Sequence, residues 1–158
     1  MKKQDARLAP ASEVLAFAAQ NTGFLLQRAH RRLRMALNEA LKPMDLMIAH
    51  VAVLGLLAER GDLIQQQLIE ILDTDKSTMV YLIDELERQG LAERRPAPGD
   101  RRAYAVHLTS RGRDRLAAAG KLVIQVEDSF LAPLSPKERA RLNKLLRRIA
   151  GTEHLDHE

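Results

Sequence analysis

The 158-residue sequence contains no cysteine and no tryptophan, and aromatic residues make up only 3% of it. The lack of cysteine excludes disulfides, zinc sites with thiolate ligands and any switch based on thiol oxidation. With so few aromatic side chains, Leu, Ala, Val, Ile and Met must fill the interior, which favours helices packed through aliphatic stripes. We therefore expect a mainly helical protein.

Long apolar runs are lacking as well. The opening residues, MKKQDARLAPASEV, contain no apolar stretch typical of a secretory signal, and the sequence nowhere reaches the ~18 consecutive apolar residues that indicate a transmembrane helix. These absences predict a cytoplasmic protein. The five histidines show no metal-ligand spacing, so we expect neither a metal nor a cofactor.

The signs of an enzyme are weak. The sequence has no glycine-rich phosphate loop and no nucleophile placed beside a base. Asp84, Glu85 and Glu87 are interpreted as the solvated flank of a helix rather than as an acid–base pair. We therefore expect a protein without catalytic residues.

Basic residues are in excess, with 25 Lys and Arg against 21 Asp and Glu, a formal charge of +4 and a pI near 9.7. This balance suits a polyanionic partner. The length allows one domain, or two small lobes that share helices.

Apolar periodicity, capping residues and the positions of Gly and Pro predict a mainly α chain with one β-hairpin. The predicted helices cover residues 12–41, 46–60, 65–72, 76–89, 109–130 and 136–150, and the predicted strands cover 91–95 and 103–108. A capping box at Ser135–Glu138 marks the start of the last helix. The apolar residues expected to be buried by that helix are Leu142, Leu145, Leu146 and Ile149.

The predicted helix 76–89 has two faces. Met79, Leu82, Ile83 and Leu86 fall on one arc of about 100°, the width of a stripe that faces a core. The opposite arc carries Ser77, Val80, Tyr81 and Asp84. Hydroxyl groups can bond to base edges, Val can contact a thymine methyl, and free amides beside Lys76 favour a phosphate. An ordinary surface helix with a polar outer face is the alternative.

A short helix at 65–72, a turn, this second helix and a hairpin with a basic tip follow the order of a winged helix-turn-helix. The segment DKSTMVYLIDELERQGLAERRPAPGDRRAYAVHLTSRG, Asp75 to Gly112, resembles the MarR family of bacterial transcription regulators. AHRRLRMALNEALKP, Ala29 to Pro43, gives weaker support. The likeness covers most of the chain in layout.

The resemblance implies a homodimer whose first and last two helices interlock and which presents two winged helices to a pseudo-palindromic DNA duplex. It divides the chain into an N-terminal dimerisation segment at 1–44, a winged helix-turn-helix DNA-binding domain at 45–108, and helices at 109–158 that complete the dimerisation domain. The implied function is a sequence-specific transcription regulator, a repressor released from its operator by a small ligand. The alternative is a winged-helix module whose arginines bind acidic proteins instead of DNA.

Proteins that this chain resembles insert an arginine of the wing into the minor groove, where the negative potential is enhanced. The matching residue here is Arg102, with Asp100 as its orienting partner; a simple ion pair that fixes the turn is the alternative. Arg94, Arg95 and Arg101 are expected to contact phosphates or to brace the hairpin. The full set of predicted DNA-contacting residues is Gln65, Lys76, Ser77, Thr78, Val80, Tyr81, Arg94, Arg95, Asp100, Arg101 and Arg102.

Three positions depart from the family pattern. Asp73 stands where relatives have a glycine in the turn, and Tyr81 stands where many have arginine or a small residue. The helix predicted at 46–60 lacks a Thr-Pro cap, so either Asp45 caps it or it starts earlier.

The resemblance also implies a small aromatic or phenolic effector, bound in a cleft between the dimerisation helices and the winged helix. His30, Arg31 and His50 are the candidate ligand-binding residues. The alternatives are that Arg31 is a solvated charge and that both histidines are hydrogen-bonded packing residues.

Overall fold

The computed structural model describes residues 20–97 and 100–151, and the side chains of all of these except 97 and 100–103. In chain order the elements are α2 (Thr22–Leu41), the 3-10 helix η1 (Lys42–Met44), α3 (Ile48–Arg60), β1 (Leu63–Ile64), α4 (Gln65–Leu72), α5 (Lys76–Arg88), β2 (Ala92–Ala97), β3 (Asp100–Leu108), α6 (Ser110–Phe130) and α7 (Pro136–Ala150). This order confirms a mainly α fold with a hairpin wing. The predicted start of the first helix, residues 12–19, lies outside the described part of the chain.

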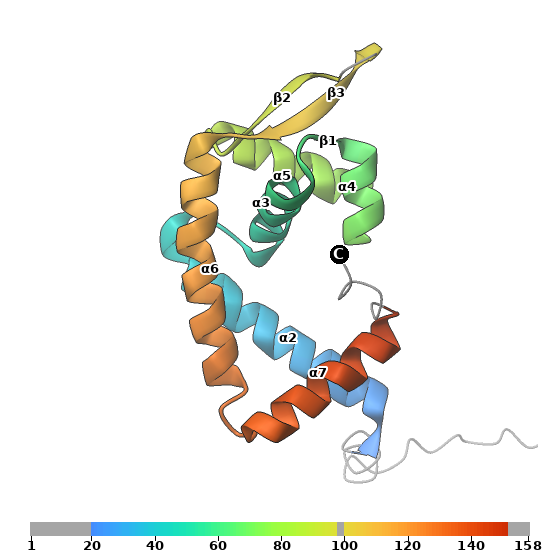
Figure 1. Ribbon diagram of the computed structural model, residues 1–158, viewed down its shortest axis with the longest axis vertical. Coiled ribbons are helices and arrows are strands. Elements are labelled where there is room, and N and C mark those ends of the chain that lie inside the picture. Colours follow the sequence, from blue (N-terminus) through green and yellow to red (C-terminus); the bar gives the residue numbers. More distant parts are fainter. Residues whose placement is uncertain (1–19, 98–99, 152–158) are drawn as a thin grey trace, which may run out of the picture.

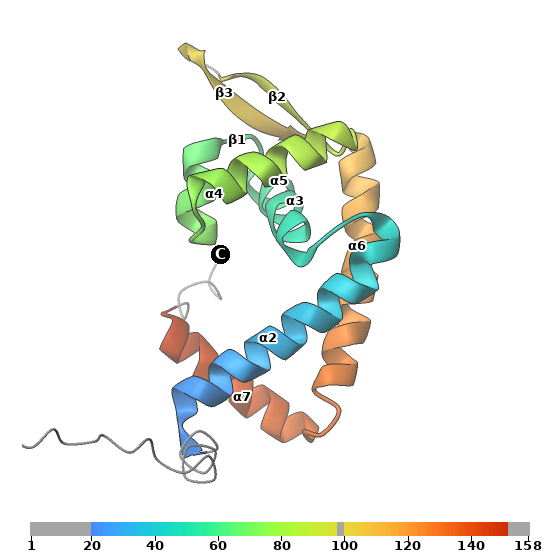
Figure 2. The same cartoon turned by 180° about the vertical axis from the view of Figure 1, so that it is seen from behind.

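The elements fall into two groups joined by one long helix. Helices α3, α4 and α5 and the three strands lie together at one end of the molecule, and α2 and α7 cross at the other end (Figure 1). Helix α6 runs along one side from the base of the hairpin to α7, as the reverse view also shows (Figure 2). The molecule therefore has the layout of a winged helix-turn-helix mounted on a helical base.

The sheet is antiparallel, with strand order β1-β3-β2. Leu63 pairs with Val106, and Ala92 pairs with Leu108. The two-residue strand β1 has no counterpart among the predicted elements, because two residues are too short to produce an alternating pattern. It attaches the wing to the start of α4, so that the hairpin and the helix-turn-helix form one unit.

Aliphatic side chains form the core of this unit, as the composition predicts. Met79, Leu82, Ile83 and Leu86 of α5 are all buried, which confirms the predicted core-facing arc. Most of α3 is enclosed as well, and its buried residues are His50, Val53, Leu54, Leu56 and Leu57. The opposite arc of α5 is thereby fixed outward, away from the core.

Helix α6 begins against the base of the wing. Thr109 caps it by accepting the Gly112 N–H at 3.0 Å, while its own N–H donates to the Leu91 carbonyl at 3.2 Å. Gly112 is buried, and its backbone faces Leu91 so closely that an added Cβ would overlap the Leu91 carbonyl oxygen. The joint between wing and α6 thus depends on a residue without a side chain.

The helical base is less buried than predicted. Within one chain α7 has no buried residue, and Leu145, Leu146 and Ile149 are 43%, 36% and 70% exposed. In α2 only Leu37 and Leu41 are buried. The prediction that α7 buries its apolar face is wrong for the described part of a single chain, because none of the described elements forms a second layer over that face.

In the described ranges, no single helix combines the length and apolar character needed to cross a membrane. Helices α2 and α3 meet this requirement only as a pair with η1, and the pair bends by 78°.

Candidate nucleic-acid interface

The N-terminus of α5 is organised by Asp75. Its carboxylate accepts the Thr78 N–H at 2.9 Å and the Thr78 hydroxyl at 2.6 Å, and the Ser77 hydroxyl also donates to it. These donors hold the pKa of Asp75 far below its usual range. Ser77 and Thr78 therefore offer only oxygen lone pairs to an external partner, which favours recognition of donors over acceptors.

The turn between α4 and α5 contains Asp73, at the position where relatives have a glycine. This residue has φ +46°, in the left-handed region that favours glycine. An aspartate tolerates this conformation better than most residues, and it serves as the C-cap of α4. The turn therefore keeps the geometry of a helix-turn-helix without the glycine that relatives have.

The outward arc of α5 is accessible. Lys76, Ser77 and Tyr81 are exposed and Val80 is half-buried, and a shallow hollow lies over Lys76, Ser77 and Val80. Gln65, at the first turn of α4, is half-buried. The arc combines an ammonium group, hydroxyl groups, an aliphatic group and an aromatic ring, which together can contact phosphates and base edges.

The wing extends beyond the core. Strands β2 and β3 stay in register to the Pro96–Tyr104 pair, followed by an irregularity before the Ala97–Asp100 pair. Val106 is buried but Tyr104 is 57% exposed, so the hairpin has already left the core at Tyr104. Nothing is described of the side chains of Asp100, Arg101 and Arg102, whose roles stay predictions.

Arg94 braces the hairpin against α5. Its guanidinium pairs with Asp84 at 2.7 Å and with Glu87, and its backbone N–H donates to Glu87 at 2.7 Å. Asp84 is exposed, as a solvated flank predicts, but Glu87 is half-buried, and the pairing of both carboxylates with the wing was not expected. Arg95 instead pairs with Glu93 of its own strand, at the surface.

Replacing Arg94 with alanine should lower the free energy of unfolding by about 1–2 kcal/mol, since it leaves the half-buried Glu87 with the backbone N–H but without the guanidinium. Arg95→Ala, the matched control, removes an exposed pair and should change it by less than about 0.5 kcal/mol. Urea unfolding of both variants measures the difference. Equal effects would contradict the bracing role of Arg94.

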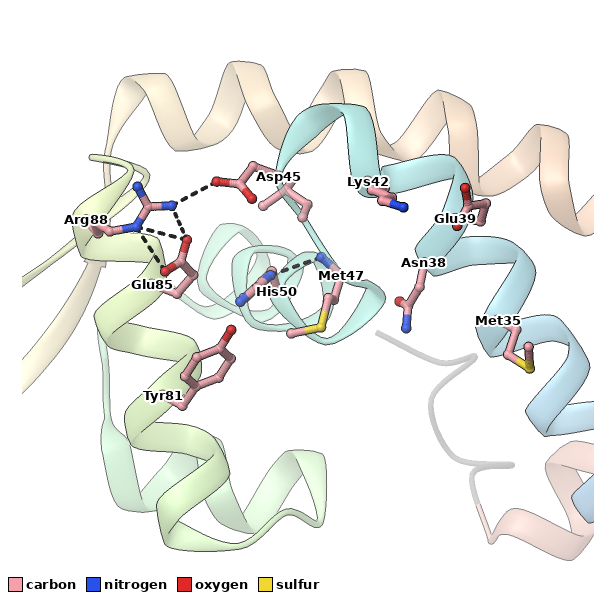
Figure 3. A pocket seen from close by; sticks show the side chains of 11 residues that line it. Met35, Asn38, Glu39, Lys42, Asp45, Met47, His50, Tyr81, Glu85 and Arg88 are labelled. Carbon is pink, nitrogen blue, oxygen red and sulfur yellow. Dashed lines mark hydrogen bonds and ion pairs between the residues drawn. The ribbon is translucent and has the colours of Figure 1, made fainter.

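A second feature adjoins the interface: a cleft of about 670 Å³ between α2, the segment linking η1 to α3, and α5 (Figure 3). One wall is an ion-pair network in which Arg88 binds Asp45 at 2.8 Å and Glu85 at 3.0 Å. Hydrogen bonds from the Arg88 and Gln89 side chains hold the pKa of Glu85 down to about 2. Sequence reasoning missed the pairing of Asp45 with Arg88, because the two residues lie 43 positions apart and share no motif.

Asn38 and His50 both support the start of α3, which begins at Ile48. Asn38 Oδ1 accepts the Ile48 N–H at 2.9 Å, and His50 Nδ1 accepts the Met47 N–H at 3.0 Å. The sequence left two alternatives for this helix, an Asp45 cap or an earlier start, and both are wrong. It starts later than predicted, and Asp45 does not cap it but adopts φ +55° and binds Arg88.

His50 is the one predicted effector residue that reaches this cleft. It is 2% exposed, and burial lowers its pKa against the opposing influence of Glu85 and Asp45. Because Nδ1 accepts the Met47 N–H, the neutral ring carries its hydrogen on Nε2. Among the described residues Nε2 has no hydrogen-bond partner.

The lowered pKa of His50 predicts a pH-dependent stability. In the unfolded chain His50 takes up a proton near pH 6.5, whereas in the folded chain it does so only at lower pH. The contribution of His50 to the free energy of unfolding should therefore be constant above about pH 6.5 and fall as the pH drops below it. His50→Asn keeps an acceptor for the Met47 N–H but cannot titrate. The variant should therefore lose less stability than the wild type as the pH falls. Urea unfolding of both proteins from about pH 7 to about pH 5 tests the prediction. Identical pH profiles would refute it.

His30 and Arg31 do not join His50. Both lie on the exposed N-terminal half of α2, where Arg31 lines a hollow with Phe24 and Arg28, and His30 also borders a groove toward α7. Within one chain His30 and Arg31 therefore share a surface of α2 that is separate from the cleft at His50.

Comparison with known proteins agrees with the fold. Residues 44–103 match the sequence profile of the MarR family. A putative transcriptional regulatory protein for the hcr operon of Thauera aromatica is 36% identical over 97 residues, 61% of this chain and 58% of that protein. The chain thus spans less than two thirds of that relative.

Two further proteins match over more of their length. The transcriptional regulator HosA of Escherichia coli is 32% identical over 66% of this chain and 78% of its own. Bordetella bronchiseptica BpsR, whose structure concerns regulation of DNA binding by 6-hydroxynicotinic acid, is 26% identical with a TM-score of 0.76, over 84% of this chain and 94% of its own. The chain therefore belongs to the MarR family of winged helix-turn-helix transcriptional regulators.

Proposed function

We propose that this transcriptional regulator binds a pseudo-palindromic operator as a homodimer, represses the adjacent gene, and releases DNA when a small aromatic ligand binds. The observation that carries the proposal is the outward arc of α5, where Lys76, Ser77 and Tyr81 are exposed beside the wing. A helix held by its apolar face, with short polar groups on the other, has the form of a helix that reads a major groove. Arg102 would reach the minor groove from the wing, with Asp100 as its partner.

The exposed apolar residues of the helical base support a homodimer. Phe24, Leu25 and Leu26 of α2 and Leu145 and Ile149 of α7 are 38% to 70% exposed in one chain. Single exposed apolar residues are common, but a group on adjoining helices is typical of an interface. In this assignment residues 1–44 and 109–158 form the dimer and residues 45–108 bind DNA.

The cleft beside α5 supports a ligand-controlled repressor. It lies between α2, which belongs to the proposed dimerisation segment, and α5, which carries the proposed DNA-contacting arc. A ligand there would contact both groups of elements at once. BpsR, which has the same fold, is described as regulated in DNA binding by a small aromatic acid.

The test is selection of binding sites from genomic DNA by the purified protein, followed by affinity measurements over a range of salt. We expect a preferred site with two half-sites, and a logarithm of affinity that falls linearly with the logarithm of salt. Arg102→Ala should weaken binding about tenfold or more and reduce the salt slope by about 1 for each half-site. A protein that selects no site at any salt, yet captures an acidic protein, would instead be an interaction module.

A further inference from the structure

The cleft beside α5 contains a buried hydrogen-bond donor without a partner. His50 is 2% exposed, its Nδ1 accepts the Met47 N–H, and its Nε2–H is left without an acceptor in the described structure. A buried polar group without a partner costs free energy that a hydrogen bond would recover. The cleft therefore offers a ready site for a ligand atom that accepts a hydrogen bond.

Tyr81 of α5 lies beside this donor in the lining of the cleft. Its ring lies 6.4 Å from the His50 ring, centroid to centroid, at an interplanar angle of 36° (Figure 3). Tyr81 is also 55% exposed on the outward arc of α5. The same side chain thus borders the cleft on one side and the proposed DNA-reading face on the other.

The charges around the cleft disfavour an anion. Three carboxylates line it, from Glu39, Asp45 and Glu85, against two cationic side chains, from Lys42 and Arg88. Arg88 is already bound by Asp45 and Glu85, so it is not available to a ligand. Lys42 is the one cationic group of the lining without a partner among the described residues, and it lies on η1, away from His50.

We propose that the cleft binds a small uncharged aromatic molecule whose carbonyl oxygen or ring nitrogen accepts the His50 Nε2–H, and that its ring takes the place of the Tyr81 ring. The displaced Tyr81 then alters the arc of α5 that contacts DNA. This inference rests on the proposed function, since it specifies the effector and its route to the DNA-binding face. It assigns Tyr81 to coupling between ligand and DNA rather than to base reading alone.

Three molecules of nearly the same shape test the ligand class: benzamide, benzoate and benzamidinium, which are neutral, anionic and cationic. The imidazole nitrogen signals of His50 in isotope-labelled protein report binding directly, with the variant His50→Asn identifying the signals. We expect benzamide to shift the Nε2 signal. Benzoate should bind at least about fivefold more weakly because of the carboxylates, and benzamidinium should fail because it has no acceptor.

His50→Asn keeps an acceptor for the Met47 N–H but removes the Nε2–H, so benzamide should bind it about tenfold more weakly than the wild type. Urea unfolding at neutral pH checks that the variant remains folded. Equal benzamide affinity for the two proteins, or preferential binding of benzoate, would overturn the inference.

The coupling between ligand and DNA is measured as the ratio of the DNA affinity without benzamide to the DNA affinity with saturating benzamide. Benzamide is uncharged, so adding it does not change the ionic strength. We expect a ratio of about five or more in the wild type and close to one in Tyr81→Ala, which should itself bind benzamide more tightly. If Tyr81→Ala showed the same ratio as the wild type, Tyr81 would not couple ligand binding to DNA binding. If no specific operator exists, the proposed function fails while the nuclear magnetic resonance result still decides the ligand class.

Discussion

Gly112→Ala is expected to lower the free energy of unfolding by about 3 kcal/mol or more. The new Cβ would overlap the Leu91 carbonyl oxygen and lie 2.7 Å from Leu108 Cδ1, well inside the contact distance of about 3.5–4.0 Å. The obstacle is backbone, which cannot rotate aside as a flexible side chain can. Either α6 moves away from the wing, breaking the Thr109 bonds, or the strands at its base shift.

The measurement is urea unfolding of the purified variant. Gly120→Ala is the matched control, because Gly120 lies in the same helix with nothing within 4 Å of its added Cβ. That variant should be neutral or more stable by up to about 1 kcal/mol, since alanine favours a helix. If the two substitutions change the free energy of unfolding by the same amount, the close approach of α6 to Leu91 does not contribute to stability.

Lys76→Glu is expected to weaken DNA binding about a hundredfold at ~0.1 M salt, with little change in stability. Lys76 is exposed at the N-terminus of α5 and has no ion-pair partner among the described residues, so the fold does not depend on it. The substitution replaces a phosphate contact with a repulsion. A dimer carries the change twice, so the slope of log affinity against log salt should fall by about 2.

Lys121→Glu on α6 makes the same change of charge at an exposed position far along the helix from the wing. It should weaken binding less than about threefold, which separates a local contact from the effect of net charge. Fluorescence anisotropy with the selected operator at several salt concentrations gives both numbers. Similar losses for the two variants would show that Lys76 does not contact DNA.

The parts of the fold with local signals were predictable. Periodicity defined the core arc of α5, and the Ser135–Glu138 capping box defined the start of α7, where Ser135 N–H donates to Glu138 at 2.8 Å. Gln65–Leu72 was predicted with its observed bounds. These features depend on residues within one or two helical turns of each other, so they can be predicted from the local sequence.

Features that depend on distant partners were not predictable. The pairing of Arg94 with Asp84 requires knowing that the wing folds back on α5, and the exposure of α7 requires knowing that no other described element covers it. His50 was selected through a family resemblance, but its unpartnered Nε2–H follows only from the Met47 contact. The roles predicted for Asp100, Arg101 and Arg102 still await a measurement.

The network at Asp45 makes the C-terminal end of α5 a fixed pivot. Arg88 binds the Asp45 carboxylate, and the Gln89 side chain donates to the Asp45 carbonyl at 2.8 Å. The helix has 13 residues, so its other end lies about 18 Å from this pivot. A rotation of about 10° would move Lys76 by about 3 Å, as much as a hydrogen-bond length. A small change at the anchored end is therefore magnified where the helix meets DNA, and in a dimer it would alter the spacing between half-sites.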